Sequence, residues 1–189
     1  MSNKVVVVDD EPITRMDIVE MLKNEGYNVV AEASDGFDAI ELCQRHNPDL
    51  VLMDVKMPLL DGLKAAEIIY QDKLAKCIVL ITAYSEKKFI EEAQKIGVMA
   101  YVVKPINEKN LMPTLAIALS KSQEFAQMEE EVEKNKVKLE DRKQIEKAKG
   151  LLIKKEGITE EEAYNKLRGL SMSKRRSMGE IARIINMDR

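Results

Sequence analysis

Short apolar runs alternate with segments of helical periodicity along the first part of the chain. The runs are four or five residues long, which suits buried strands. They are Lys4–Val8, Asn28–Glu32, Leu50–Met53, Cys77–Ile81 and Ala100–Val103. Between them, apolar residues recur three or four positions apart, as they do on one face of a helix. Near-continuous apolar strands separated by helices predict an α/β fold with a five-stranded, doubly wound parallel sheet that is covered on both faces.

A long helical pattern follows this region. From Leu111 to about Glu156 there is no proline after Pro113 and no glycine before Gly150, and most residues favour helix. This predicts one long helix or two abutting ones. Within it, six positions have the three-four spacing of a coiled-coil seam: Phe125, Met128, Val132, Asn135, Leu139 and Arg142. Because two of the six are polar, both a dimeric coiled coil and a single solvated helix are consistent with the pattern.

Two further helices are predicted after the long one. Gly157 can end the long helix. Thr159-Glu160-Glu161-Glu162 and Ser177-Met178-Gly179-Glu180 both have the spacing of a capping box, which marks the start of a helix. Together with the end of the long helix they predict a small three-helix all-α domain. The expected parts are a domain over residues 1–120, a helical coiled-coil linker over 121–141 and a three-helix module over 142–189.

The net charge of −3 hides an asymmetry between the two ends of the chain. Residues 1–120 carry 13 Lys and Arg against 19 Asp and Glu, a net of −6. Residues 142–189 carry 13 against 7, a net of +6. A basic end on an acidic protein indicates an anionic partner, with nucleic acid the first candidate and a membrane surface the second.

Several functional classes are not expected from the sequence. Cys43 and Cys77 lie in apolar contexts without a CxxC motif, which argues against a metal-thiolate site and fits a reduced compartment. No stretch approaches the ~20 apolar residues that span a membrane, and the N-terminal apolar run is too short for a signal peptide. Residues 121–189 offer no nucleophile–base pair and no Gly-rich loop. We therefore expect a cytoplasmic protein that is not an enzyme and does not bind a membrane.

Acidic residues follow two of the predicted strands. Asp9 and Asp10 come directly after Lys4–Val8, and Asp54 comes directly after Leu50–Met53. Because the carboxyl ends of parallel strands lie along one edge of a sheet, where ligands of open α/β folds bind, we expect one acidic pocket. A carboxylate can accept a phosphoryl group, and a divalent ion removes the repulsion between the donor and the acids. The pattern predicts Asp54 as a phosphoryl acceptor that works with Mg2+.

Each neighbouring residue of the pocket has an expected role. The oxygen ligands of Mg2+ are expected to be Asp10 and Asp54 directly, Asp9 through a water molecule, and the main-chain carbonyl of Lys56. Thr82 and Lys104 come directly after two further strands. The Thr82 hydroxyl could donate a hydrogen bond to the transferred phosphate, and the Lys104 ammonium could pair with it as a point charge.

Taken together, these motifs resemble the receiver domain of two-component response regulators. The resemblance covers about residues 1–120 and is carried by Asp9-Asp10-Glu11, Asp54 with Met57-Pro58 and Asp61-Gly62, Thr82-Ala83, and Tyr101-Val102-Val103-Lys104-Pro105. It implies phosphorylation of Asp54 by a sensor histidine kinase in the presence of Mg2+.

The same resemblance implies a switch at two further residues. The Thr82 hydroxyl would move toward the phosphate while the Tyr101 ring turns inward, although Tyr101 could also be a static core residue. A cis Lys104-Pro105 bond is implied as well. Lys56 and Tyr84 occupy positions that tune the lifetime of the phosphate in this family.

The basic end resembles the ANTAR domain, a three-helix RNA-binding module found behind receivers in transcription antiterminators. The resemblance covers roughly residues 130–189 and is carried by the run from Arg142 to Leu152, Ala163-Tyr164 with Leu167-Arg168, Ser171-Met172 and Ile181-Ala182. With its receiver, the chain is similar to the antitermination regulators of ethanolamine utilisation. This implies RNA hairpin loops in leader transcripts as a partner, and a homodimer that forms on phosphorylation.

Contacts to RNA would come mainly from cations in this module. Sequence-specific readers of RNA engage unstacked bases with aromatic rings or Arg planes, and phosphate contacts would make binding salt-dependent. The candidate residues are Arg142, Lys149, Gly150, Tyr164, Arg168, Lys174, Arg175 and Arg176. Gly150 could allow a close approach of the RNA backbone, and Tyr164 could equally be a core residue of the bundle.

The resulting hypothesis is a phosphorylation-activated regulator that binds paired RNA hairpins in nascent transcripts and prevents transcription termination. Two alternatives remain open. One is a DNA-binding output, because Glu180–Asn186 resembles the first helix of a helix-turn-helix. The other is a tail that only docks a protein partner.

Overall fold

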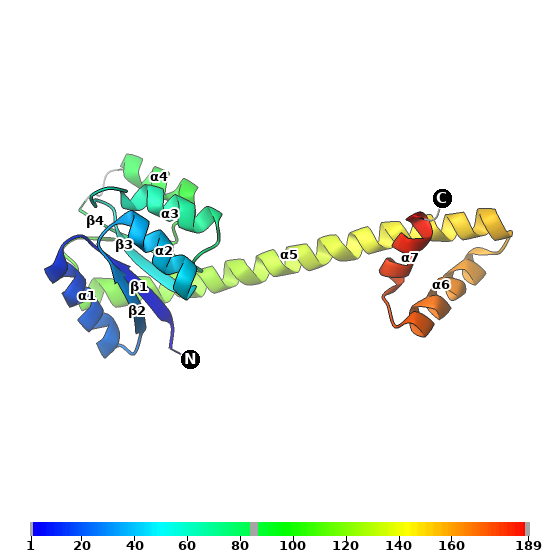
Figure 1. Cartoon of the computed structure of the whole chain (residues 1–189), viewed down its shortest axis with the longest axis horizontal. Helices are drawn as coiled ribbons and strands as arrows, with labels where there is room; N and C mark the ends of the chain where they lie inside the picture. The colour runs from blue at the N-terminus through cyan, green and yellow to red at the C-terminus, as the bar shows by residue number, and fades with distance from the viewer. Residues whose placement is uncertain (1, 84–86, 188–189) are drawn as a thin grey trace. The chain divides into compact units, whose positions relative to one another are not determined.

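The computed structural model describes residues 2–83 and 87–187. In chain order the elements are β1 (Lys4–Val8), α1 (Pro12–Asn24), β2 (Asn28–Ala33), α2 (Gly36–His46), β3 (Leu50–Asp54), α3 (Gly62–Gln71), β4 (Ile78–Thr82), α4 (Lys87–Ile96), β5 (Ala100–Val103), α5 (Glu108–Glu156), α6 (Glu160–Lys174) and α7 (Met178–Met187) (Figure 1). The chain divides into two compact units, Met1–Ala126 and Gln127–Arg189, and helix α5 contributes to both.

The five strands form one parallel sheet in the order β2-β1-β3-β4-β5. The α/β fold predicted from the apolar runs is thereby confirmed. Successive side chains of a strand point to opposite faces, so Val5 and Val7 lie in one core cluster and Val6 and Val8 in the other. Helices α1 and α5 cover the first face, and α2, α3 and α4 cover the second. All four valines are fully buried, which explains why the last four positions of β1 are all apolar.

Helix α5 is a single helix of 49 residues, which confirms the first of the two forms expected for this stretch. In its early part, Leu111, Leu115 and Ala118 are buried against the sheet. Further along the helix, large apolar side chains such as Phe125 and Leu139 are more than half exposed. The first turns of α5 therefore complete the core of the first unit, while apolar side chains further along the helix are exposed to solvent.

The second unit has its own core between the end of α5, α6 and α7. Its fully buried side chains are Ala148, Ala163, Leu167 and Ala182. Alanine at three of these positions allows the three helices to approach closely. The three-helix arrangement expected from the sequence is confirmed for these residues.

The predicted helix boundaries in this unit are also confirmed. Gly157 has a positive φ of 69° and its N–H donates to the Ile153 carbonyl, which ends α5. Thr159 and Glu162 form both hydrogen bonds of a capping box at the start of α6. Ser177 and Glu180 form the equivalent pair at the start of α7, at 2.9 and 3.1 Å.

Among the residues that the structure describes, no helix combines the length and the apolar character that crossing a membrane requires.

Candidate functional sites

Three carboxylates meet at the carboxyl edge of the sheet. Asp9 and Asp10 follow β1, Asp54 is the last residue of β3, and these two strands are neighbours. Oxygen atoms of the three side chains lie within 4.8 Å of one another. Asp9 is fully buried and Asp54 is 5% exposed, while Asp10 is open to solvent. The acidic pocket predicted from the strand ends is present, and its oxygen-only donor set suits Mg2+.

Lys104 joins two of these carboxylates. It follows β5, and its Nζ lies 3.1 Å from Asp9 Oδ2 and 3.2 Å from Asp54 Oδ2. The peptide bond between Lys104 and Pro105 is cis, as the resemblance to receiver domains implied. With three carboxylates and one ammonium, the site keeps an excess of negative charge that a bound cation would reduce.

Burial and charge act against each other at this edge. Burial raises the pKa of Asp54, and the charge of Asp9 also raises it, while Lys104 lowers it; the net pKa lies above the ordinary 3.8. Burial alone would lower the pKa of Lys104, but the hydrogen bond to Asp9 and the charge of Asp54 raise it above the ordinary 10.5. The ammonium is therefore held firmly in its charged form.

A small cavity lies beside the Asp54 carboxylate. It measures about 110 Å³ and is lined by Asp54, Val55, Lys56, Thr82, Ala83 and Lys104. Thr82 ends β4, the strand next to β3, and is 1% exposed. Since one water takes about 30 Å³ of liquid volume, this cavity has room for a small group of a few heavy atoms next to Asp54, Thr82 and Lys104.

The position of Asp54 depends on Gly62, for which the sequence indicated only a place in a motif. A Cβ placed on Gly62 would lie 2.0 Å from the Asp54 carbonyl oxygen, so only glycine fits there. The Gly62 N–H donates to the Val55 carbonyl at 2.9 Å, and the Asp61 side chain caps α3 by accepting from Lys64 N–H at 3.0 Å. The loop after β3 therefore folds back onto the strand end.

Asp9 is held by two further contacts, one local and one that joins distant elements. Its Oδ1 accepts a hydrogen bond from the Glu11 N–H at 2.8 Å. Its carbonyl accepts one from Arg15 Nη1 at 2.6 Å, and Arg15 also pairs with Glu32 at 3.3 Å. Arg15 lies on α1 and Glu32 on β2, so no local pattern could have indicated this arrangement.

The remaining receiver residues are placed as follows. Tyr101 lies on β5, is partly buried and packs against the cluster under α2, α3 and α4. Both interpretations of this ring, a switch and a static core residue, stay open. Lys56 is exposed at the edge of the cavity. Tyr84 lies outside the described residues.

Most of the candidate RNA-binding residues lie on the surface of the second unit. The exposed ones are Arg142, Gly150, Tyr164, Arg168, Lys174, Arg175 and Arg176. Tyr164 is 44% exposed, and the core of the three helices is built from other residues. Of the two interpretations of Tyr164, the structure therefore favours the surface one.

Lys149 differs from the other cations of this unit. It is 8% exposed, and its Nζ lies 2.8 Å from Glu146 Oε1 and 2.7 Å from Glu160 Oε1. The hydrogen bonds to these two carboxylates raise the pKa of Lys149 above its ordinary value. Its ammonium links α5 to the start of α6, so it stabilises the three-helix unit.

Comparison with known proteins agrees with both parts of the chain. The family model for the response regulator receiver domain matches residues 5–116, and the model for the ANTAR domain matches residues 133–185. The transcriptional regulatory protein PdtaR of Mycobacterium tuberculosis is 43% identical over 182 residues, which cover 96% of this chain and 88% of PdtaR.

Two solved structures resemble the first unit. A two-component response regulator of the LuxR family from Aurantimonas has a TM-score of 0.60 and 31% identity, over 70% of this chain and 99% of that chain. The CheX–CheY–BeF3–Mg2+ complex from Borrelia burgdorferi has a TM-score of 0.57 and 27% identity, over 60% of this chain and 86% of that chain.

Proposed function

The chain belongs to the response regulators that carry a receiver domain and a C-terminal ANTAR domain, and from this premise we propose a phosphorylation-activated antiterminator. A sensor histidine kinase phosphorylates Asp54 in the cytoplasm. The phosphorylated protein then binds paired hairpins in nascent leader transcripts and prevents transcription termination. In this assignment, residues 1–120 receive the signal, 121–141 form the helical linker, and 142–189 bind RNA.

Asp54 is the phosphoryl acceptor in this proposal. Its carboxylate opens into the 110 Å³ cavity and lies 3.2 Å from Lys104 Nζ. When bound to Asp9, Asp10, Asp54 and the Lys56 carbonyl, Mg2+ would neutralise the charge that otherwise repels an incoming phosphoryl group. The presence of Mg2+ and BeF3 in the complex of a similar receiver fold supports the use of Mg2+. Lys104 and Thr82 would then hold the oxygens of the transferred group.

The surface cations of the second unit are the RNA contacts in this proposal. Arg175 and Arg176 lie between α6 and α7, where the chain turns and both side chains are exposed. Lys174, Arg168 and Arg142 add further exposed charge. Tyr164 offers an exposed ring on which an unpaired loop base can stack. Lys149 would contribute indirectly, because its ion pairs position α6 and therefore Tyr164 and Arg168.

Phosphorylation couples the two parts through dimerisation in this proposal. A phosphate adds about 1.5 to 2 negative charges, draws Thr82 toward it and turns Tyr101 inward, which changes the receiver surface. Two receivers then pair, and two RNA modules of a dimer can bind two hairpins at once. Linking two weak sites raises affinity without new contacts, so a dimer suits a transcript with paired hairpins that overlap a terminator.

The observation that carries this proposal is the Lys104 ammonium between Asp9 and Asp54, at the mouth of a phosphoryl-sized cavity, in a chain that also has a basic ANTAR unit. The test compares wild type with Asp54→Ala and uses Asp38→Ala, an exposed acid of α2, as the control. Binding to a paired-hairpin RNA and readthrough of its terminator are measured with and without a small phosphodonor and Mg2+.

Wild type and Asp38→Ala are expected to gain RNA affinity and readthrough with the donor, while Asp54→Ala does not. An Asp54→Ala variant as active as phosphorylated wild type would refute the switch. A preference for duplex DNA over hairpin RNA at the same salt concentration would instead support the DNA-binding alternative. Unchanged RNA affinity after neutralising Arg168, Arg175 and Arg176 together would support a tail that docks a protein.

A further inference from the structure

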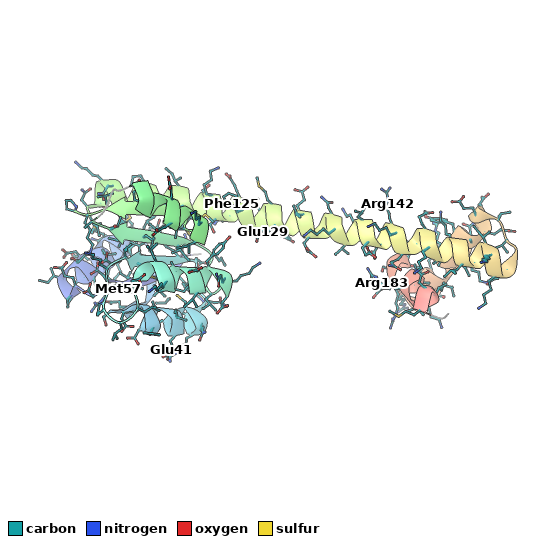
Figure 2. The ribbon with its side chains drawn as sticks, turned by 90° about the horizontal axis from the view of Figure 1, so that it is seen from above. Glu41, Met57, Phe125, Glu129, Arg142 and Arg183 are labelled. Atoms are coloured by element: carbon teal, nitrogen blue, oxygen red, sulfur yellow. The ribbon has the colours of Figure 1, made fainter. Side chains whose placement is uncertain are left out.

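A stripe of apolar side chains on helix α5 is left uncovered within the chain. Its exposed fractions are 56% for Phe125, 59% for Met128, 53% for Val132 and 57% for Leu139. Asn135 and Arg142 complete the three-four spacing and are also exposed. Figure 2 shows Phe125, Glu129 and Arg142 along this helix. We call these six positions the α5 stripe. A stripe with this spacing is the surface through which one helix pairs with another.

The charges that flank the α5 stripe are separated along the helix. The flanking acids, Glu124, Glu129 and Glu131, all precede the flanking cations, Lys136, Lys138 and Lys143. Within the part of the chain that the structure describes, Glu129, Glu131, Lys138 and Lys143 take part in no ion pair. Their charges are thus available to a second helix.

A parallel pair of α5 helices would bring like charges together. In that orientation each stripe residue faces its own copy, and each flanking residue that directly precedes a stripe residue faces the partner's residue five positions further along. Glu124 would lie near the partner's Glu129, and Lys138 near the partner's Lys143. Arg142 would face the partner's Arg142. Only Glu131 would meet an opposite charge, the partner's Lys136.

In an antiparallel pair, one register of the two helices avoids these contacts between like charges. When Val132 lies opposite the partner's Asn135, Met128 lies opposite the partner's Leu139. Glu129 then lies beside the partner's Lys136, and Glu131 beside the partner's Lys138. By symmetry each of these ion pairs forms twice, and none of these flanking contacts joins like charges.

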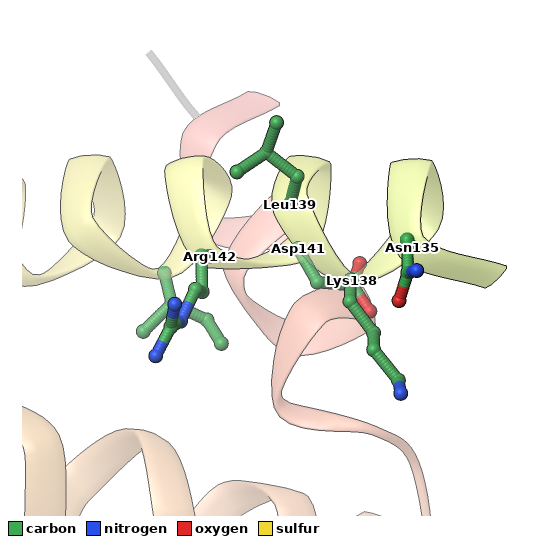
Figure 3. A pocket seen from close by; sticks show the side chains of 6 residues that line it. Asn135, Lys138, Leu139, Asp141 and Arg142 are labelled. Atoms are coloured by element: carbon green, nitrogen blue, oxygen red, sulfur yellow. The ribbon is translucent and has the colours of Figure 1, made fainter. Parts of the chain in front are cut away.

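The same register gives a role to the polar end of the stripe. Phe125 lies opposite the partner's Arg142, where a guanidinium over an aromatic ring is favourable. Arg142 also lines a hollow of about 540 Å³, together with Asn135, Lys138, Leu139, Asp141 and Ile145. In Figure 3 the side chains of Lys138 and Arg142 point to one side of α5 and that of Leu139 points to the other. The hollow can receive the partner's Phe125, whereas a parallel pair would bring two hollows together.

We propose that helix α5 pairs with α5 of a second copy in antiparallel orientation, with Val132 opposite the partner's Asn135. In this pair Arg142 is covered, and the C-terminal ends of the two helices point in opposite directions. The consequence for regulation rests on the proposed function. Because the pair keeps two RNA modules apart and covers an RNA contact, it is the resting state that receiver pairing must replace.

Disulfide trapping tests the orientation on the full-length, unphosphorylated chain without RNA. Met128→Cys protein is mixed with Leu139→Cys protein of different tag mass and oxidised mildly. The mixed disulfide is expected to dominate over the disulfide that each variant forms alone. Self-disulfides of each variant, or the absence of any disulfide, would overturn the proposal. Cys43 and Cys77 are buried with pKa values raised to about 12, so the wild-type chain should stay uncrosslinked as the control.

A charge exchange gives an independent test by sedimentation equilibrium. Lys138→Glu places two acids beside each other in the antiparallel pair and should weaken association at least several-fold, while Glu131→Lys combined with Lys138→Glu should restore it. In a parallel pair, Lys138→Glu would meet the partner's Lys143 and strengthen association, which would refute the proposal. Neither test involves phosphate or RNA, so a negative result here leaves the proposed function intact.

Discussion

Lys104 Nζ lies 3.2 Å from Asp54 Oδ2 and contacts Asp9 Oδ2 at 3.1 Å. The lysine follows β5, while the two acids belong to the ends of β3 and β1. One ammonium therefore links the end of β5 to the ends of two strands that are not neighbours of β5 in the sheet. We expect both the stability of this edge and its affinity for a cation to depend on this contact.

Replacing Lys104 with Met should make the receiver more dependent on Mg2+. Without the ammonium, two buried carboxylates lose their partner, and we expect a loss of about 1 to 3 kcal/mol in the free energy of unfolding at neutral pH. Mg2+ should recover more stability in this variant than in wild type, because it replaces the missing positive charge. Urea unfolding with and without MgCl2 measures both effects.

Lys64→Met is the matched control for this experiment. Lys64 is an exposed lysine of the same unit that pairs with Asp61 at 3.5 Å, and such surface pairs contribute about 0 to 1 kcal/mol. Its response to Mg2+ should equal that of wild type. A Lys104→Met protein that gains no more from Mg2+ than Lys64→Met would contradict the assignment of the cation site.

The raised pKa of Asp54 predicts how stability changes with pH. Because burial raises the folded-state pKa above the ordinary 3.8, the native state binds this proton more tightly than the unfolded chain does. Its contribution is fully present below the unfolded pKa and is lost as the pH rises through the folded pKa. Relative to wild type, Asp54→Asn should therefore gain stability as the pH rises from 4 toward 7, measured by the urea midpoint. A stability advantage of Asp54→Asn over wild type that shrinks over this range would be inconsistent with a buried carboxyl whose pKa is raised.

A close contact between α7 and α5 predicts that position 179 does not tolerate a side chain larger than that of glycine. A Cβ there would lie 2.2 Å from Asp141 Oδ1, and the same carboxylate holds Arg183 Nη2 at 2.6 Å. Gly179→Ala should therefore cost about 1 to 3 kcal/mol in the second unit, as overpacking does. Gly169→Ala in α6, where a Cβ would meet open space, should instead add about 0.5 to 1 kcal/mol. Thermal unfolding by circular dichroism compares the two, and equal effects would argue against the contact.

Replacing Gly150 with Ala should change helix stability and RNA affinity in opposite directions. A Cβ there would meet open space on helix α5, so Gly150→Ala should stabilise the helix by about 0.5 to 1 kcal/mol. If the RNA backbone approaches closely at this point, the same variant should bind hairpin RNA at least several-fold more weakly. Filter binding at fixed salt measures this, with Gly169→Ala as the control. Unchanged RNA affinity would remove Gly150 from the contact surface.

The salt dependence of RNA binding should identify the cations that touch phosphate. For each phosphate contact removed, the slope of log K against log salt should fall by about 1. We expect this for Arg175→Ala and Arg176→Ala, which are exposed. Lys166→Ala should leave the slope unchanged, because Lys166 Nζ is already paired with Glu156 Oε1 at 2.7 Å. An equal change in slope for all three variants would indicate a diffuse electrostatic effect rather than defined contacts.

The sequence predicted features that local patterns encode. The strand boundaries are within one residue of those in the structure; β4, for example, runs from Ile78 to Thr82 rather than from Cys77 to Ile81. Both capping boxes and the αL glycine at Gly157 form as expected. These features depend on hydrogen bonds and side-chain periods that span only a few residues. The acidic edge could be predicted for the same reason, because each acid directly follows an apolar run.

Only the tertiary structure decided which of these residues contact one another. It placed Lys104 between Asp9 and Asp54, packed Gly62 against the Asp54 carbonyl and held Asp9 through Arg15. In the second unit it paired Lys149 with Glu160 of another helix and left Tyr164 outside the core. Periodicity gives the face of a helix or strand but not its rotation against a neighbour. The partner of a charge is set by how whole elements pack, and no single stretch of sequence contains that information.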